Sequence, residues 1–438
     1  MQAVIMAGGK GTRLAEITKN IIPKPMVPVC GKPLLEWQIE KLKEYGVDHV
    51  TMIVGFLGDV IREHFGDGSA FGIKIDYITE EEPLGTAGAL YYYRAMLEED
   101  DFLLIFGDIF FDFDIRRMLY YHSLRHAAVT LMAHPNIHPY DSDLIRTDED
   151  GRVTGFDSKH NKRDYWYDNC VNAGIYVMNR SVLSKLHKVK KRDLEKELLA
   201  GMVKKNEAVY AYRTPEFVRD VGTVDRIRKT EADIVSGLTA AKNLNNRQKA
   251  IFLDRDGTLN VYQGFIRREE DFELEKGVCH ALQKINSSGY LAVCVTNQPV
   301  IARGELSFSG LENIHNKMKT LLGREGAYLD DVLFCPHHPD GGYEGEVPEL
   351  KVRCRCRKPE PGMLEEAADK FNIDLASSWI IGDGTIDMET GRRAGVKTVL
   401  VKTGLKGEDG RFSAAADLEA EDLESAVDMI LARDREQE

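Results

Sequence analysis

The feature that most constrains the fold is an apolar strand pattern that leads straight into a glycine-containing loop, and it occurs twice. It reads AVIMAGGKG from Ala3 and AIFLDRDGT from Ala250. Each string is typical of the first βα unit of an α/β domain. The 438 residues are enough for two or three domains at roughly 150 residues each.

A boundary between two domains is indicated by Ser236 and Gly237 and by the polar stretch that follows them. We therefore predict one domain over residues 1–237, a linker over 238–248 and a second domain over 249–438. Each half is long enough to bury a hydrophobic core of its own.

Short apolar runs alternate with amphipathic segments in both halves. Strands are predicted over 3–6, 50–54, 74–78, 102–106, 128–133, 171–177, 250–254, 291–296, 331–335, 379–383 and 398–401. Helices are predicted over 34–45, 87–97, 115–125, 277–287, 309–323, 362–371 and 387–394. This alternation indicates two doubly wound α/β domains whose sheets are largely parallel. In such sheets, sites form at the carboxyl ends of the strands.

The composition narrows the classes of function. A net charge of −13 argues against nucleic-acid binding, which needs a basic face. Seven cysteines are too few and odd in number for a disulfide scaffold, which favours a reducing compartment. The sequence has no apolar run near the roughly 18–20 residues that span a bilayer. We expect a cytoplasmic protein with no membrane or nucleic-acid partner; the oligomeric state stays open, a homo-oligomer included.

The first glycine loop has the features of a phosphate-binding loop. Gly8, Gly9 and Gly11 let the backbone approach a phosphate closely, and Lys10 and Arg13 add positive charge. The alternative is a tight turn with solvated charges. The more specific signal is the whole GGKGTRL string followed by a PKP string that contains Lys24.

These strings resemble the sugar-1-phosphate nucleotidyltransferases, and other landmarks follow in the family's order. They are an EPLGTAG string over residues 82–88, Gly107-Asp108 at a strand end, an NAG turn over 172–174, and a DVGT string over 220–223. The resemblance covers roughly residues 1–235.

The resemblance implies roles for named residues. Arg13 and Lys24 would hold the triphosphate, while Asp108 and Asp220 would hold Mg²⁺. Nucleotide contacts would come from Gly8, Gly9, Gly11, Thr12, Gly85 and Thr86, and sugar contacts from Asn172, Gly174 and Lys159. The family's usual sugar-binding glutamate is replaced by Ser158, which leaves the sugar open. The PLGTAG loop most resembles the branch that uses guanine and mannose-type sugars.

The second opening places two aspartates, Asp254 and Asp256, at the end of an apolar strand. This DxDGT string resembles motif one of the haloacid-dehalogenase (HAD) phosphatases, and the further motifs follow in order at Thr296, Lys358 and Asp383. No large insertion separates the motifs, so we expect a HAD-like sheet with a minimal cap.

The phosphatase resemblance also implies roles. Asp254 would attack phosphorus, and Asp256 would protonate the leaving group and later deprotonate water. Thr296 and Lys358 would bind the transferring oxygens. Mg²⁺ would sit on the side chains of Asp254 and Asp383 and on the backbone carbonyl of Asp256.

A cluster of soft ligands lies in the second half. Cys335, His337, Cys354 and Cys356 have the spacing of a closed structural zinc site. His338 is the alternative histidine ligand; His337 is preferred because Cys-x-His and Cys-x-Cys then pair symmetrically. A disulfide is the competing interpretation.

This cysteine loop, together with Asn297, Arg303 and Arg357, resembles the heptose-bisphosphate phosphatases, with the histidinol phosphatases as near relatives. Those three residues would contact the substrate, the two arginines at its retained 1-phosphate. The alternative interpretation of the cationic run over residues 351–358 is a solvated basic loop. Pro299-Val300 and Gly384 depart from the branch pattern.

The two resemblances together imply a bifunctional enzyme of nucleotide-activated heptose synthesis. It would remove the 7-phosphate of D-glycero-D-manno-heptose 1,7-bisphosphate and transfer GMP from GTP to heptose 1-phosphate. One alternative is a mannose- or hexose-1-phosphate nucleotidyltransferase fused to a histidinol-phosphatase-like enzyme. Another, of a different class, is a regulatory protein that senses sugar nucleotides.

Overall fold

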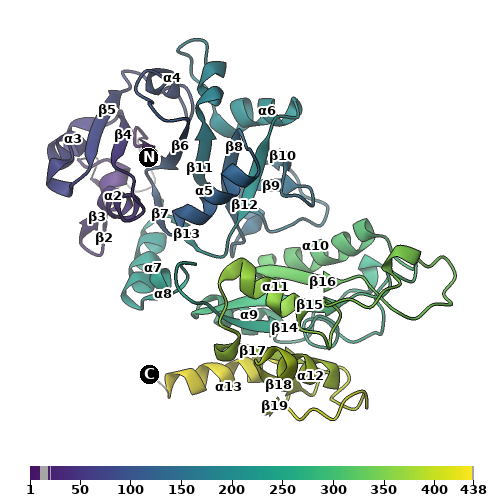
Figure 1. The fold of residues 1–438 in the computed structure, drawn as a ribbon. Helices are drawn as coiled ribbons and strands as arrows, with labels where there is room; N and C mark the ends of the chain where they lie inside the picture. Colours follow the sequence, from purple (N-terminus) through teal and green to yellow (C-terminus); the bar gives the residue numbers. More distant parts are fainter. Residues whose placement is uncertain (10–17, 20, 437–438) are drawn as a thin grey trace. The chain divides into compact units, whose positions relative to one another are not determined.

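The computed structural model describes residues 1–9, 18–19 and 21–436 (Figure 1). The chain divides into two units. The N-terminal unit comprises Met1–His134, Asp143–Ser158 and Cys170–Asn243, and the C-terminal unit comprises Pro135–Ser142, Lys159–Asn169 and Leu244–Glu438. The predicted linker over 238–248 contains a short helix, α8 (Leu238–Ala241), and its residues are shared between the units.

The sheet of the N-terminal unit runs in the order β10-β9-β11-β6-β1-β4-β5, and β8 joins β12 to β11. Its strands are β1 (Gln2–Met6), β4 (His49–Val54), β5 (Lys74–Thr79), β6 (Asp101–Phe106), β8 (Val129–His134), β9 (Leu144–Thr147), β10 (Val153–Asp157), β11 (Val171–Asn179) and β12 (Val209–Arg213). Two small ribbons pair β2 (Pro28–Val29) with β3 (Lys32–Pro33) and β7 (Ile109–Asp112) with β13 (Phe217–Asp220).

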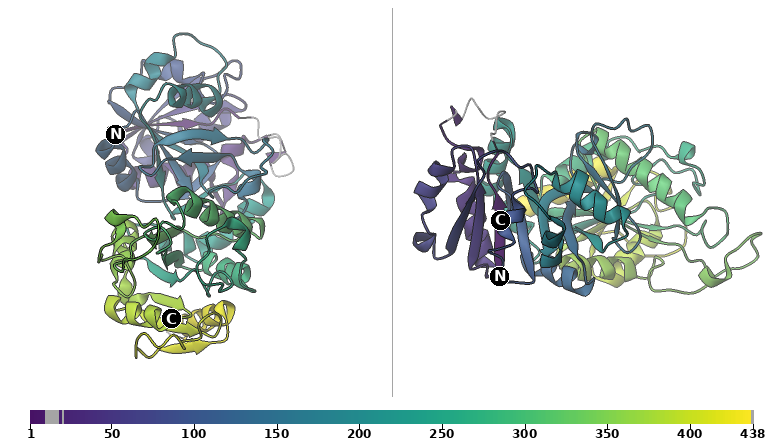
Figure 2. Two further views of the ribbon diagram at one scale, coloured as in Figure 1. Left: turned by 90° about the vertical axis from the view of Figure 1, so that its right-hand side faces the viewer. Right: turned by 90° about the horizontal axis from the view of Figure 1, so that it is seen from above.

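The helices of this unit lie on both faces of the sheet (Figures 1 and 2). They are α2 (Leu34–Glu44), α3 (Gly58–Phe65), α4 (Leu90–Tyr93), α5 (Ile115–Leu124), α6 (Ala200–Lys204), α7 (Val224–Val235) and α8, with a π-helix over Leu194–Leu199.

The prediction of a largely parallel sheet is wrong for this unit, whose sheet is mixed. β1, β4, β5 and β6 are parallel neighbours, but β11 is antiparallel to β6, β8 and β9. β9 and β10 are joined by a short turn, which returns the chain antiparallel instead of through a crossover helix.

The predicted helix over 87–97 is also shorter, since α4 covers only Leu90–Tyr93. Backbone groups that precede α4 pair with the segment before the π-helix instead. Ala87 N donates to Arg192 O, and Arg192 N donates to Leu84 O.

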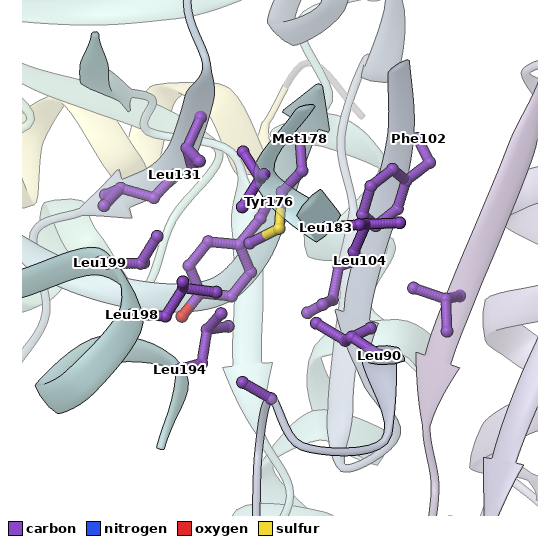
Figure 3. Close-up of a cluster of buried hydrophobic side chains, with 14 of the residues drawn as sticks. Leu90, Phe102, Leu104, Leu131, Tyr176, Met178, Leu183, Leu194, Leu198 and Leu199 are labelled. Carbon is purple, nitrogen blue, oxygen red and sulfur yellow. The ribbon is translucent and has the colours of Figure 1, made fainter. Parts of the chain in front are cut away.

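Alternate residues of the central strands enter two separate cores. On β1 and β6, Val4 and Leu104 face one cluster, while Ile5 and Leu103 face the other. This period-two pattern is the signature of a strand that is buried on both faces. Figure 3 shows the first cluster, in which Tyr176 lies among leucines of the π-helix.

The sheet of the C-terminal unit is parallel throughout, as predicted, in the order β16-β15-β14-β17-β18-β19. Its strands are β14 (Lys249–Leu253), β15 (Tyr290–Asn297), β16 (Asp331–Cys335), β17 (Trp379–Gly382), β18 (Lys397–Val401) and β19 (Leu418–Ala420). Its helices are α9 (Val278–Asn286), α10 (Phe308–Arg324), α11 (Gly362–Phe371), α12 (Thr385–Ala394) and α13 (Leu423–Arg435). Apolar residues of α9, α10 and α13 share one core, and those of α11 belong to the other.

Two segments that the sequence places in the first domain belong to the C-terminal unit. The second of these segments, Lys159–Asn169, bonds to α10. Its Asp168 pairs with Lys319 at 2.8 Å, and its Tyr167 N donates to the Thr320 hydroxyl at 2.9 Å. Across the part of the chain that the structure describes, we find no helix with the length and apolar character that crossing a membrane would need.

The buried β6 gives a direct test of the first core. We expect Leu104→Ala to lower the free energy of unfolding of the N-terminal unit by about 2–5 kcal/mol, because the fully buried side chain leaves a cavity. Native-state hydrogen exchange of the β1 and β6 peptides measures this loss. Leu124→Ala is the matched control: Leu124 is 61% exposed on α5, so its change should stay within about 0.5 kcal/mol.

Candidate active sites

In the N-terminal unit, the Lys24 ammonium lies between two of the predicted aspartates. It forms an ion pair with Asp108, and its Nζ is 3.5 Å from Oδ1 of Asp220. Both carboxylates are about one-third exposed, at 32% and 34%, while the Lys24 side chain is only 12% exposed. A second cation, Arg226, donates to Oδ2 of Asp220 at 2.8 Å.

Strand pairing brings these two aspartates together from distant parts of the chain. Asp108 lies in the turn between β6 and β7, and Asp220 ends β13. In the β7–β13 ribbon, Asp220 is paired with Ile109, and Val221 N donates to Asp108 O at 3.0 Å. Thr223 then caps the N-terminus of α7, the helix that carries Arg226.

Two carboxylates that reach the same ammonium can also share a divalent cation, so these side chains fit a Mg²⁺ site with hard oxygen ligands. Gly8 and Gly9 follow β1, as predicted. Arg13, Gly11 and Thr12, predicted to contact the triphosphate and the nucleotide, lie outside the described residues, as does Lys10.

Glu80, which is not among the predicted site residues, lies beside Gly8 of the first glycine loop and bonds to the EPLGTAG loop. Its Oε1 accepts a hydrogen bond from Leu84 N at 3.0 Å, and a Cβ at Gly8 would lie 2.5 Å from its Oε2. Burial raises the pKa of Glu80. The signal available was its position, directly after β5 and just before the loop.

The predicted sugar turn is an irregularity in β11. The register of β11 against β8 shifts between Asn172 and Tyr176, and Gly174 has a φ of 75°. Asn172 Oδ1 accepts from Gly174 N at 3.2 Å. Lys159, the other predicted sugar contact, lies in the 159–169 segment of the C-terminal unit, where its Nζ is 3.9 Å from Asp141.

In the C-terminal unit, three carboxyl groups gather at the carboxyl ends of β14 and β17. Oxygens of Asp254, Asp383 and Asp387 all lie within 4.8 Å of one another. Asp254 follows β14 and Asp383 follows β17. The strand order changes direction at β14, and α/β sheets bind ligands at that point. Asp387, from α12, was not assigned a role by the sequence analysis.

Lys358 is the buried counter-charge of this cluster. Its Nζ lies 2.8 Å from Asp254 Oδ1 and 2.6 Å from Asp387 Oδ1, and its side chain is 2% exposed. Burial raises the pKa of Asp254 to about 7, and the Asp387 and Asp256 charges add to this, whereas Lys358 opposes it. Burial and the charges of Asp254 and Asp387 likewise raise the pKa of Asp383 to about 8.

One ammonium cannot neutralise three carboxylates, so the cluster suits a divalent cation with oxygen ligands. The backbone leaves room for close approach: Gly257 has a φ of 86°, and a Cβ there would lie 2.1 Å from Asp383 Oδ2. The same oxygen accepts from Leu405 N at 2.7 Å.

The Asp256 carboxyl turns to Arg255 and Gln298 rather than joining the other three. The fully buried Arg255 donates to both of its oxygens, at 2.8 and 3.0 Å, and Gln298 Nε2 donates to Oδ2 at 2.9 Å. Gln298 also donates to Thr296 Oγ1 at 2.9 Å. Through Gln298, these bonds hold Asp256, the predicted acid–base group, next to Thr296, the predicted ligand of the transferring phosphate.

Asn297, predicted to contact substrate, is engaged with the backbone of Lys358. Its Nδ2 donates to Lys358 O and its Oδ1 accepts from Lys358 N, both at 3.0 Å. The two bonds fix the loop that carries the ammonium.

The structure brings Cys335, His337, Cys354 and Cys356 together as one group. The Sγ atoms are 3.2–3.5 Å apart, and His337 Nδ1 is 3.4 Å from Cys356 Sγ. Ligand atoms around a tetrahedral zinc ion are about 3.8 Å apart, so the group fits zinc. The hydrogen bond between Cys356 and Cys335 lowers the pKa of Cys356 to about 5. The three thiols form no disulfide.

The other histidine, His338, contacts Arg303 instead. Arg303 donates to His338 Nε2 at 3.2 Å, and its guanidinium lies 4.5 Å from the ring centres of both Phe265 and Tyr343. Arg357 donates to His337 O at 3.1 Å. Burial lowers the pKa of Arg357, and the nearby Arg303 and Arg411 charges contribute to this. These arginines form a cationic region beside the cysteine group.

Comparison with known proteins agrees with this division into two kinds of enzyme, a nucleotidyltransferase and a HAD phosphatase. The chain belongs to the nucleotidyl transferase family, whose model matches residues 2–237. The model of a HAD-hydrolase-like family matches residues 355–426.

Two relatives match separate halves of the chain. The mannose-1-phosphate guanylyltransferase of Mycobacterium tuberculosis is 32% identical over 249 residues, which is 57% of this chain and 68% of that protein. The D-glycero-beta-D-manno-heptose-1,7-bisphosphate 7-phosphatase of Haemophilus ducreyi is 42% identical over 185 residues, 42% of this chain and 97% of that protein.

Solved structures also match separate halves. HddC from Yersinia pseudotuberculosis covers 53% of this chain and 99% of its own, with 25% identity and a TM-score of 0.47. The D,D-heptose 1,7-bisphosphate phosphatase of B. bronchiseptica, complexed with magnesium and phosphate, covers 42% and 99%, with 30% identity and a TM-score of 0.37.

Removing the buried ammonium should destabilise the C-terminal unit in a pH-dependent way. Lys358→Met leaves buried carboxylates unpaired, which costs about 3–5 kcal/mol. The pKa values of Asp254 and Asp383 already lie above those of unfolded carboxyl groups and would rise further. The folded variant therefore binds protons more tightly than the unfolded chain, and the loss should be larger at pH 8 than at pH 5.5.

Urea unfolding at the two pH values, without added divalent metal, measures this difference. Lys249→Met is the matched control because Lys249 is 47% exposed in its ion pair with Asp434; its effect should stay within about 0.5–1 kcal/mol. A loss for Lys358→Met that is equal at both pH values would contradict the electrostatic explanation.

Proposed function

We propose that this chain is a bifunctional enzyme of nucleotide-activated heptose synthesis. Its C-terminal site removes the 7-phosphate of D-glycero-D-manno-heptose 1,7-bisphosphate. Its N-terminal site transfers GMP from GTP to heptose 1-phosphate and releases pyrophosphate. The observation that carries the proposal is that a heptose-bisphosphate phosphatase and a sugar-1-phosphate guanylyltransferase each match one half of the chain.

In the phosphatase reaction, a carboxylate oxygen of Asp254 attacks phosphorus and the bond to the 7-oxygen breaks. Asp256 gives its proton to the leaving oxygen and then takes one from the attacking water, which hydrolyses the aspartyl-phosphate. Lys358 and Thr296 hold the transferring oxygens, and the Lys358 charge favours the ionised form of Asp254. Mg²⁺ on Asp254, Asp383 and the Asp256 carbonyl would supply the remaining positive charge.

In the transferase reaction, an oxygen of the sugar 1-phosphate attacks the α-phosphorus of GTP in line, and pyrophosphate leaves. This chemistry depends on positioning and charge neutralisation. Lys24 and Arg13 bind the triphosphate, with Gly8, Gly9, Gly11, Thr12, Gly85 and Thr86 around the nucleotide. Asp108 and Asp220 would hold Mg²⁺ there. Asn172 and Gly174 contact the sugar.

The order of the two reactions follows from their chemistry, because the phosphatase leaves the 1-phosphate on which the transferase acts. Arg303 and Arg357 offer paired guanidinium groups for that retained phosphate. The second candidate is transfer to mannose 1-phosphate, which the guanylyltransferase relative favours.

A substrate panel with single-site variants tests both halves. We expect phosphate release from heptose 1,7-bisphosphate, and pyrophosphate release from GTP with heptose 1-phosphate. Asp254→Asn should reduce only phosphate release, by about 10³-fold or more, because it removes the nucleophile. Asp220→Asn should reduce only pyrophosphate release, so each variant serves as the control for the other.

The outcomes separate the alternatives. No pyrophosphate release with any nucleotide and sugar 1-phosphate would refute the transferase. Release with mannose 1-phosphate but not with heptose 1-phosphate would favour the second candidate. Phosphate release that persists in Asp254→Asn would refute the nucleophile.

The cysteine group gives an independent test. Metal analysis of protein purified without chelators should find one zinc ion per chain, since four soft ligands converge there. Cys354→Ser should lose the zinc and weaken phosphate release, because the same loop carries Lys358. Cys279→Ser, in the partly buried position on α9 outside the group, should keep it. Zinc-free wild-type protein would count against this site.

A further inference from the structure

The EPLGTAG loop is attached to the segment that leads into the π-helix Leu194–Leu199. Leu194 N donates to the Thr86 hydroxyl at 2.7 Å. Gly85 has a φ of 75°, and a Cβ there would lie 2.5 Å from Arg192 O. These contacts fix the start of the π-helix against the EPLGTAG loop.

From the same π-helix, Glu195 reaches the sugar turn through one intermediary. The Tyr176 hydroxyl donates to Glu195 Oε1 at 3.1 Å, and Asn172 Nδ2 donates to the Tyr176 oxygen at 2.8 Å. Tyr176 is fully buried, with its ring beside Leu194 and Leu198 (Figure 3). The chain of hydrogen bonds thus runs from Glu195 to Asn172 through a buried ring.

The direction of these hydrogen bonds is set at the glutamate end. An ionised carboxylate can only accept, so the Tyr176 hydroxyl must donate to Glu195 and its oxygen must accept from Asn172. The Asn172 amide is thereby fixed with Nδ2 toward Tyr176, and Oδ1 accepts from Gly174 N. In the hydrogen bonds of the described residues, one amide N–H and one oxygen lone pair of Asn172 take no part, and these can meet a ligand. A sugar hydroxyl can both accept from and donate to such a pair.

The Glu195 carboxyl is only partly accessible and stands among further charges. Burial raises its pKa to about 7, and the Tyr176 hydrogen bond opposes that rise. Asp143 and Asp193 raise the pKa further, whereas Lys196 lowers it. When protonated, Glu195 can donate to Tyr176, and the direction of the chain is no longer fixed.

We propose that Glu195 is a positioning residue for sugar recognition, which acts through Tyr176 to orient the Asn172 amide toward a hydroxyl of the sugar 1-phosphate. This inference rests on the proposed transferase function and names a determinant of its sugar site.

Steady-state kinetics of pyrophosphate release test the proposal, with heptose 1-phosphate or mannose 1-phosphate as the varied substrate. Glu195→Gln keeps the shape of the side chain but removes the charge. At pH 8 it should raise the KM for the sugar 1-phosphate by about 3- to 10-fold, the value of one hydrogen bond. The KM for GTP and kcat should change by less than about twofold, because neither depends on Asn172.

The ratio of variant to wild-type KM is the decisive quantity. It should fall toward one at pH 6, where Glu195 is protonated in the wild type as well, while titration of the sugar phosphate cancels in the ratio. Tyr176→Phe should raise the KM at pH 8 similarly, and the double variant should add little to either change. Glu149→Gln and Tyr120→Phe, both exposed, are the controls and should leave every constant unchanged.

Three outcomes would overturn the inference. If the wild type is active and Glu195→Gln has an unchanged KM for the sugar 1-phosphate, this inference is refuted while the proposed function stands. A KM ratio that is the same at both pH values, or an equal effect on GTP, would indicate a merely structural role. Absence of transferase activity in the wild type would refute it together with the proposed function.

Discussion

In each unit, a lysine ammonium lies between two aspartates that come from different elements, and the loops around both sites depend on this charge pairing. Lys24 pairs with Asp108 and Asp220, and Lys358 with Asp254 and Asp387. Carboxylates held this close repel one another, and the fixed ammonium offsets that repulsion. The ammonium also leaves carboxylate oxygens for a divalent ion, which connects the stability of each site to its chemistry.

Both sheets bring aspartates to the same topological position: Asp108 follows β6 in one sheet, and Asp254 and Asp383 follow β14 and β17 in the other. The first strand of each sheet lies between its successor and a later strand: β4-β1-β6 in one, β15-β14-β17 in the other. The chain leaves the first strand on one side and a later strand on the other, so the loops at their carboxyl ends diverge and leave room for a ligand. Residues more than a hundred positions apart, such as Asp254 and Asp383, therefore meet because of strand order alone.

Much of this was readable from the sequence, because strand ends marked by Asp108, Asp254 and Asp383 carry both the fold signal and the chemistry. The mixed N-terminal sheet was not, since a long apolar strand such as β11 looks the same in either direction. Glu195 was missed for another reason: its hydrogen bond reaches Tyr176 on a different element, and no local pattern distinguishes it from a surface glutamate. Asn297 is the opposite case: it belongs to a recognised motif and was predicted to contact substrate, but its side chain bonds to the backbone of Lys358.

The two segments over 135–142 and 159–169 bear on how such a protein could arise and be taken apart. They lie within the transferase half of the sequence, yet Asp168 and Tyr167 bond to α10 of the C-terminal unit. The border between the two enzymes is consequently not one point on the chain. Cutting the chain near residue 243 would separate both segments from the C-terminal unit to which they belong. An isolated N-terminal half, or a chimaera joined at that point, would keep the two segments without their partner residues on α10.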